Sequence, residues 1–129
     1  FVIHGAPGWD EATPVGPFVL FDVHKDRVER KVRDPAAFGV PRCSPQELAG
    51  GDAPENARRL RAALSGGSGP DRNAIVLGAA LALEVTGQAP DLIHGLAAAE
   101  QAIEAGAAVT LLDRLEGPYA TREGAAISA

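Results

Sequence analysis

One segment, from about residue 71 to residue 86, constrains the fold of this chain more than any other. It has the length of a helix between Gly69-Pro70 and Gly87, and it is apolar nearly all round: Ile75, Val76, Leu77, Leu81, Leu83 and Val85. Such a helix must be buried on several sides. A chain of 129 residues has room for one domain. We therefore expect this helix to belong to a body larger than the chain itself.

Start and stop signals place further helices around this one. Ser44-Pro45-Gln46-Glu47 has the form of a capping box, and Asp52-Ala53-Pro54-Glu55 repeats the device. Gly50-Gly51-Asp52 is interpreted as a turn into that second cap. The predicted main helices cover about residues 52–65, 71–86, 91–105 and 107–115. The domain is expected to span residues 1–116, followed by a flexible tail over residues 117–129.

The first third of the chain has the character of a small sheet. Phe1-Val2-Ile3 is apolar and β-branched, which predicts the end of a buried strand. Glycines and prolines make residues 5–17 a loop. Residues 18–23 and 28–32 are predicted strands joined by a hairpin turn, and charges on the second one indicate a solvent-facing edge. The order of elements predicts an α/β fold: strands and a hairpin followed by about four helices.

Composition excludes several functional classes. The net charge of −5 and the pI near 5.1 provide no field to gather nucleic-acid phosphates. A single cysteine, Cys43, excludes an internal disulfide framework and suits a cytoplasmic protein. No apolar run approaches the roughly 18 residues that a membrane helix needs, and the N-terminus does not resemble a signal peptide. We therefore expect neither nucleic acid nor a membrane among the partners.

Two adjacent carboxylates, Asp10 and Glu11, are the best candidates for chemistry. They lie in the loop after the first strand, and ligands of α/β proteins bind at loops of this kind. On a loop bent by glycine and proline, both side chains can turn toward one cation. Mg²⁺ prefers one or two carboxylates, water and substrate phosphate oxygens. The alternative is that the two acids are simply solvated, which is usual for adjacent acids in a loop.

Other reactive residues have simpler interpretations. His4 at the end of a predicted buried strand suits a hydrogen-bonded structural histidine, and His24 and His94 are expected at the surface. Cys43 has no companion histidine at catalytic spacing, which favours a buried or idle thiol. The glycine-rich segment 65–70 lacks the lysine of a phosphate-binding loop and follows no strand. We interpret it as a helix stop and linker.

Several short motifs together resemble one enzyme family in order and spacing. They are Phe1-Val2-Ile3-His4-Gly5, Gly8-Trp9-Asp10-Glu11 with Thr13 and Gly16-Pro17, Asp34-Pro35 through Phe38-Gly39, Gly50-Gly51-Asp52 with Glu55-Asn56-Ala57, Leu64-Ser65-Gly66, Gly69-Pro70, Val76-Leu77 with Ala79-Ala80, and Gly87. With these residues the chain resembles the C-terminal part of anthranilate phosphoribosyltransferases, over residues 1 to about 116. The resemblance implies a fragment of the phosphoribosyltransferase and nucleoside phosphorylase type of α/β domain.

The resemblance also implies an activity. These enzymes of tryptophan biosynthesis transfer the phosphoribosyl group of 5-phosphoribosyl 1-diphosphate to anthranilate and release diphosphate. Asp10 and Glu11 match the family's acidic pair that binds Mg²⁺. The catalytic and substrate-binding residues, and the small domain through which the family forms homodimers, are expected in an N-terminal part that this chain lacks. The isolated 129-residue piece is therefore expected to be inactive.

Three departures from the family pattern keep other functions open. Gly78 replaces a frequent asparagine, Glu84 replaces a common tyrosine, and Trp9 is bulkier than the usual glycine-rich loop. The alternatives are a paralogue of the same fold without this activity, binding a ligand or nucleic acid, or a nucleoside phosphorylase. None of the departures removes a carboxylate of the acidic pair.

Overall fold

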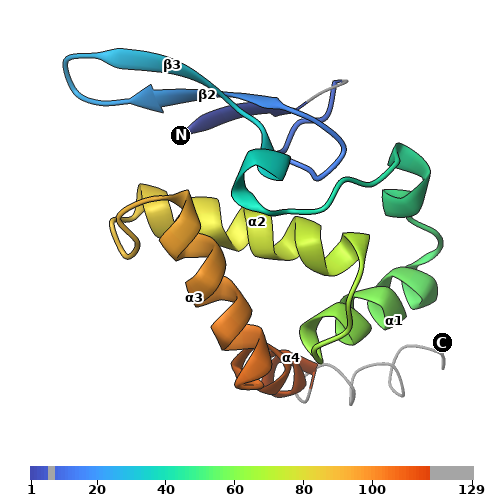
Figure 1. Ribbon diagram of the computed structural model, residues 1–129. Coiled ribbons are helices and arrows are strands. Elements are labelled where there is room, and N and C mark those ends of the chain that lie inside the picture. The colour runs from blue at the N-terminus through green and yellow to red at the C-terminus, as the bar shows by residue number, and fades with distance from the viewer. Residues whose placement is uncertain (6–7, 117–129) are drawn as a thin grey trace, which may run out of the picture.

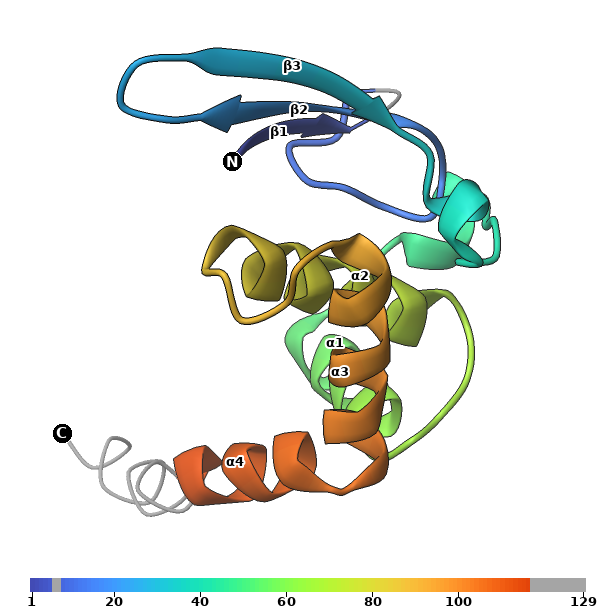
Figure 2. The ribbon, with the colours of Figure 1, turned by 60° about the vertical axis from the view of Figure 1, so that its left-hand side comes forward.

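A computed structural model of the chain describes residues 1–5 and 8–116. These residues form two layers, a three-stranded sheet and a group of α-helices beneath it (Figures 1 and 2). The elements in chain order are β1 (Val2–Gly5), β2 (Phe18–Val23), β3 (Val28–Arg33), the 3-10 helices η1 (Pro35–Phe38) and η2 (Pro45–Leu48), α1 (Ala53–Leu64), α2 (Pro70–Val85), α3 (Leu92–Glu104) and α4 (Ala107–Glu116). The predicted α/β fold, with its hairpin and later helices, is confirmed. The predicted flexible tail, residues 117–129, lies outside the described residues.

The sheet is an antiparallel meander in the order β1-β2-β3. The predicted hairpin turn is present, and the backbone N–H of His24 donates to the carbonyl of Arg27 at 2.9 Å. The first strand is buried on one face only, because Ile3 packs against the core while Val2 is 59% exposed. Within the described part of the chain β1 pairs with β2 alone, so its other edge has no neighbouring strand.

The two faces of the sheet have different surroundings. The inner face packs on α2, and there Phe18 and Leu20 join Leu77 in the core with at most 1% of each exposed. Most of the outer face is apolar, with residues from all three strands side by side in the register: Val2, Val19, Phe21, Val23, Val28 and Val32. Among the described residues, Val2, Val23, Val28 and Val32 are more than half exposed, and Val19 and Phe21 are half-buried. The sheet therefore has one packed face and one open face.

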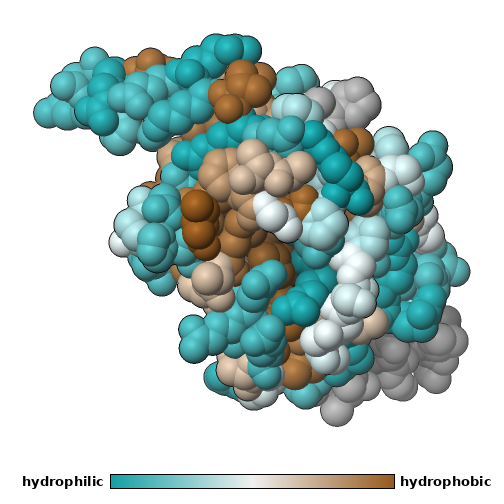
Figure 3. All heavy atoms as spheres, in the orientation of Figure 1, coloured by the Kyte–Doolittle hydropathy of each residue, from teal (hydrophilic) through white to brown (hydrophobic). Residues whose placement is uncertain are grey.

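The helices pack most closely where α2 and α3 meet. A Cβ atom placed on Gly95 of α3 would lie 2.6 Å from the carbonyl oxygen of Ala80 in α2, so only glycine fits there. Four residues of α2, Val76, Leu77, Ala80 and Leu81, are buried in the core against the sheet and α3, whereas Val85 is 49% exposed and Gly78 is also exposed. The burial of this helix in a larger body stays a prediction. Figure 3 shows hydrophobic residues gathered on the face formed by α2 and α3. None of the described helices is long and apolar enough to cross a membrane.

Candidate functional site

The loop between β1 and β2 closes tightly on Gly5. The backbone N–H of Gly5 donates to the carbonyl of Trp9 at 2.8 Å, and that of Gly8 donates to the carbonyl of Gly5 at 3.0 Å. A Cβ atom on Gly5 would lie 2.1 Å from the carbonyl oxygen of Glu11, closer than any real contact. The absence of a side chain at Gly5 therefore lets the loop fold back on the end of β1. This close approach sets the position of the acidic pair.

The two acids of the pair lie in different surroundings. Both are exposed, but Glu11 also lines a cavity of about 240 Å³ between the loop and the helices. We call it the loop cavity. Its walls include Trp9, Glu11 and Thr13 from the loop, Arg59 from α1, and Asp71 and Ile75 from α2. Alternate loop residues thus face one cavity, a spacing that could have been noticed in the sequence. Which groups an ion could reach there depends on the opposite wall.

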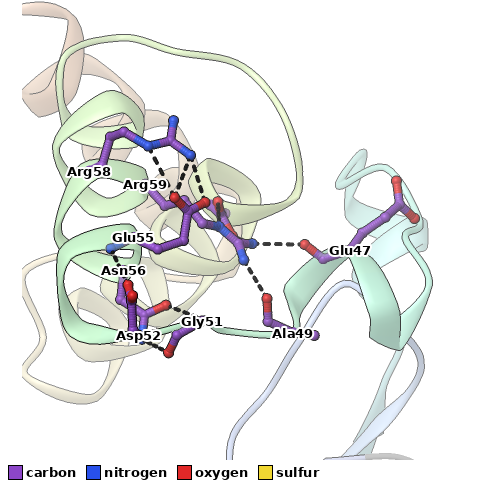
Figure 4. A network of polar contacts seen from close by, with 9 residues as sticks. Glu47, Ala49, Gly51, Asp52, Glu55, Asn56, Arg58 and Arg59 are labelled. Atoms are coloured by element: carbon purple, nitrogen blue, oxygen red, sulfur yellow. Dashed lines mark hydrogen bonds and ion pairs between the residues drawn. The ribbon is translucent and has the colours of Figure 1, made fainter.

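The opposite wall is held together by Arg59 (Figure 4). Its Nε donates to the Asp71 carboxylate at 2.8 Å, and its Nη2 donates both to that carboxylate and to the carbonyl of Glu47. Its Nη1 donates to the carbonyl of Ala49. The hydrogen bonds to Asp71 raise the pKa of the Arg59 guanidinium. Four of the five guanidinium N–H donors are thereby engaged. Arg59 of α1 therefore links this helix to η2, to the residue that follows η2, and to α2.

The glycine pair before α1 is a structural turn, as predicted. The side chain of Asn56 accepts from the backbone N–H of Gly51 at 2.8 Å and donates to its carbonyl at 3.0 Å. The carboxylate of Asp52 accepts from the backbone N–H of Glu55 at 2.9 Å, which confirms the predicted cap. Figure 4 shows these contacts beside the Arg59 network. Both polar atoms of the Asn56 side chain therefore have partners within the fold.

Of the polar groups at the loop cavity, the Glu11 carboxylate suits a cation. Thr13 is 3% exposed, and its hydroxyl has no hydrogen-bond partner within the described part of the chain. Sequence analysis gave Thr13 no role. Carboxylate oxygen atoms are ligands that Mg²⁺ prefers, so Glu11 fits the expected ion, whereas the Thr13 hydroxyl has less than 1 Å² of accessible surface. Among the described residues no group of three or more His, Cys, Asp or Glu side chains could hold a metal. A cation here would therefore keep water or substrate ligands.

The histidines and the cysteine lie away from the loop cavity wall. His4, interpreted as a hydrogen-bonded structural histidine, is exposed on the outer face of β1. His24 and His94 are at the surface as predicted, paired with Asp22 at 3.0 Å and Asp91 at 2.7 Å. Burial, and then the charges of nearby acids, raises the pKa of the Cys43 thiol. This supports the interpretation of an idle thiol.

Two of the three departures from the family pattern have a structural explanation. Glu84 in α2 forms a two-pronged ion pair with Arg33 in β3, with distances of 2.6 and 2.7 Å. Trp9 contributes to the wall of the loop cavity beside Glu11. Gly78 has no atom within 4 Å of the place where a Cβ would lie, and nothing in the structure requires glycine there. None of the three occupies the position of an acid of the pair.

Comparison with known proteins gives consistent matches. Residues 1–109 match the model of a glycosyl transferase family, a/b domain. An anthranilate phosphoribosyltransferase of Solibacter usitatus is 40% identical over 108 residues, which are 84% of this chain and 32% of that protein. One from Rubrobacter xylanophilus is 44% identical over 114 residues, covering 88% of this chain and 33% of that protein. The chain thus spans about a third of the length of these curated relatives.

Solved structures show the same fold. The crystal structure of anthranilate phosphoribosyltransferase from Thermus thermophilus superimposes with a TM-score of 0.78 at 32% identity, covering 87% of this chain and 33% of that one. The enzyme from Saccharomyces cerevisiae in complex with PRPP and Mg superimposes with a TM-score of 0.76 at 24% identity, covering 86% of this chain and 32% of that one. At that identity the yeast structure shows a shared fold alone.

Proposed function

The chain belongs to the glycosyl transferase family whose a/b domain it matches over residues 1–109, and from this premise we propose that it is part of an anthranilate phosphoribosyltransferase. The reaction is transfer of the phosphoribosyl group of 5-phosphoribosyl 1-diphosphate to the amine of anthranilate, with release of diphosphate. The observation that carries the proposal is the carboxylate of Glu11 at the loop cavity, in a loop that closes on Gly5. Curated relatives with this name support the choice of acceptor.

In this proposal Asp10 and Glu11 hold Mg²⁺. The carboxylates supply negative oxygen ligands, and the loop on Gly5 orients them before substrate arrives. Bound Mg²⁺ would neutralise the charge that develops on the departing diphosphate. A yeast relative solved with PRPP and Mg supports this choice of ion. An aromatic amine is already a nucleophile at neutral pH, so the chain need not supply a strong base.

The remaining machinery is proposed to lie outside this chain. As the resemblance implies, the diphosphate loop, the acceptor channel and the dimer-forming domain would belong to the other two thirds of the enzyme. The complete protein would then be a cytoplasmic homodimer. This chain would contribute the acidic loop, the α2 and α3 layer behind it, and the closing strands of the sheet.

The test is loss of anthranilate fluorescence in the full-length protein that carries this chain, with phosphoribosyl diphosphate and Mg²⁺. We expect a loss of signal that requires all three components. Asp10→Asn and Glu11→Gln preserve shape but remove charge, and each should lower turnover at limiting Mg²⁺ by about 10- to 100-fold. Circular dichroism should show an unchanged fold. Unchanged turnover of both variants at limiting Mg²⁺ would refute the metal role.

The same assay separates the other functions. A folded, intact protein that consumes no anthranilate would favour a paralogue that keeps the scaffold for another ligand. Release of ribose 1-phosphate from nucleosides in the presence of phosphate would instead identify a nucleoside phosphorylase.

A further inference from the structure

The only tryptophan of the chain, Trp9, directly precedes the acidic pair, and the structure fixes where its side chain starts. Ile3 packs against the core, so Gly5, two residues further along β1, faces the same inner side of the sheet. A Cβ atom placed on Gly5 would lie 3.0 Å from the Cβ atom of Trp9. The Trp9 side chain therefore leaves the loop on the side of the sheet where the helices lie (Figure 2).

The loop cavity that Trp9 lines has apolar residues on its opposite wall. Leu48 of η2, Leu60 of α1 and Ile75 of α2 belong to that wall. Each of the three is left partly exposed, and Leu60 is 42% exposed. Trp9 is itself half-buried. An indole ring that lies against such aliphatic side chains removes apolar surface from water, and this attaches the loop to the helices.

The backbone on either side of Asp10 is attached to the end of β1. The backbone N–H of Gly5 donates to the carbonyl of Trp9 at 2.8 Å, and the Glu11 carbonyl lies where a side chain on Gly5 would be. Asp10, between them, is exposed. The acidic pair is thus held by a backbone attachment to the sheet, and the indole provides a second attachment to the helices.

We propose that Trp9 is a positioning residue whose indole anchors the acidic loop on the helices, so that Asp10 and Glu11 are ordered before a cation binds. The proposal rests on the metal role of this pair in the proposed function. A mobile loop must become ordered when it binds an ion, and the loss of conformational entropy weakens binding. A loop that is already anchored loses less entropy on binding, so its carboxylates bind the ion more tightly.

Hydrogen exchange of the full-length protein that carries this chain tests the anchor without any cation. Trp9→Ala removes the indole, whereas Trp9→Phe keeps an aromatic ring. Amide exchange in a peptide that spans β1 and the acidic loop should become about tenfold faster in Trp9→Ala and change less than about twofold in Trp9→Phe. A peptide from α3 is the control and should exchange at the parent rate. Unchanged exchange of the loop peptide in Trp9→Ala would overturn the anchoring role.

The Mg²⁺ dependence of turnover tests whether the anchor serves the ion. Trp9→Ala should raise the Mg²⁺ concentration for half-maximal turnover about tenfold, with turnover at saturating Mg²⁺ within about twofold of the parent protein. Trp9→Phe should stay within about threefold of the parent in both quantities. If Trp9→Ala instead lowers turnover at saturating Mg²⁺ and leaves the half-maximal concentration unchanged, its role is merely structural and the proposal is overturned.

Glu11→Gln separates failure of the anchor from failure of the proposed function. If Glu11→Gln raises the Mg²⁺ requirement and Trp9→Ala does not, the role of Trp9 is overturned and the metal role of Glu11 stands. If neither substitution changes the Mg²⁺ requirement, or if turnover does not depend on Mg²⁺, both are overturned.

Discussion

At the scale of single residues, neighbours in the sequence can have very different chemical surroundings. Asp10 and Glu11 both carry a carboxylate, yet Glu11 lines a cavity with a buried hydroxyl and an ion pair on its walls. The difference arises from the backbone at Gly5, where the loop approaches too closely for any side chain. A carboxylate beside a partly enclosed space contributes more to ion binding than one fully in water. Glu11 is therefore expected to be the stronger ligand of the two.

The reactivity of the Cys43 thiol tests how its surroundings change its pKa. Burial is the largest cause of its raised thiol pKa, followed by the charges of Glu47 and Asp71. A raised pKa leaves less thiolate at neutral pH, and the thiolate is the nucleophile. Alkylation by iodoacetamide at pH 8 should thus be several-fold slower in the folded chain than in urea. The inflection of rate against pH should also lie higher. Because the chain has one cysteine, mass spectrometry follows it alone. Equal rates in both states would contradict this assignment.

The acidic pair can be recognised from the sequence, but the residues that surround it in the fold cannot. Asp10 and Glu11 are recognisable because they are adjacent and follow a glycine-rich turn. The role of Arg59 could not be assigned from the sequence, because it depends on Asp71, which the fold brings to the cavity from α2. Local pattern predicts which side chains can bind an ion. The three-dimensional fold decides which of them already have partners.

At the scale of elements, boundaries were easier to predict than burial. The caps at Asp52 and Asp91 depend on the residues that follow within one turn, so the starts of α1 and α3 could be predicted. Burial of the outer face of β1 and of the exposed side of α2 stays a prediction. An apolar side chain indicates that a surface should be covered, but covering it requires another element to pack there. No described element covers these two surfaces.

The crossing of α2 and α3 gives a prediction for helix packing. Gly95→Ala places a methyl group where the Ala80 carbonyl now lies 2.6 Å away, so the helices must move apart. We expect a loss of about 2 kcal/mol in the free energy of unfolding, measured by urea denaturation.

Gly78→Ala is the matched control, since it is the same change in the neighbouring helix. Its Cβ meets nothing within 4 Å and the position is exposed. Alanine favours helix over glycine, so this variant should gain up to about 1 kcal/mol. Two variants that change stability in the same direction would show that close packing at Gly95 is not the cause.

At the scale of the whole molecule, one ion pair joins the two layers. Arg33 of β3 binds both carboxylate oxygens of Glu84 in α2, with 15% and 13% of the two side chains exposed. The Arg33 guanidinium also lies 5.8 Å from the centre of the Phe1 ring, and the hydrogen bonds to Glu84 raise its pKa. The pair therefore fixes how the sheet sits on the helices. It also explains why an acid is compatible with this position of α2.

Glu84→Gln should separate the contribution of this pair from ordinary surface charge. The substitution leaves Arg33 charged and largely enclosed, so we expect unfolding free energy to fall by about 2 kcal/mol. The control is Arg58→Gln, which breaks an exposed pair with Glu55 and should cost at most about 0.5 kcal/mol. Chemical denaturation measures both. Comparable losses of unfolding free energy in the two variants would mean that the Arg33–Glu84 pair stabilises the fold no more than an exposed ion pair does.

The strand order has a consequence for the route by which the chain folds. Each strand pairs with the next one along the chain. The sheet can therefore form by closing only short loops between neighbouring strands. The Arg33–Glu84 contact closes 51 residues and requires both layers to exist first. Sheet and helices are therefore expected to form as separate nuclei and dock late. Substitutions in the hairpin would then slow folding, whereas substitutions between the layers would mainly hasten unfolding.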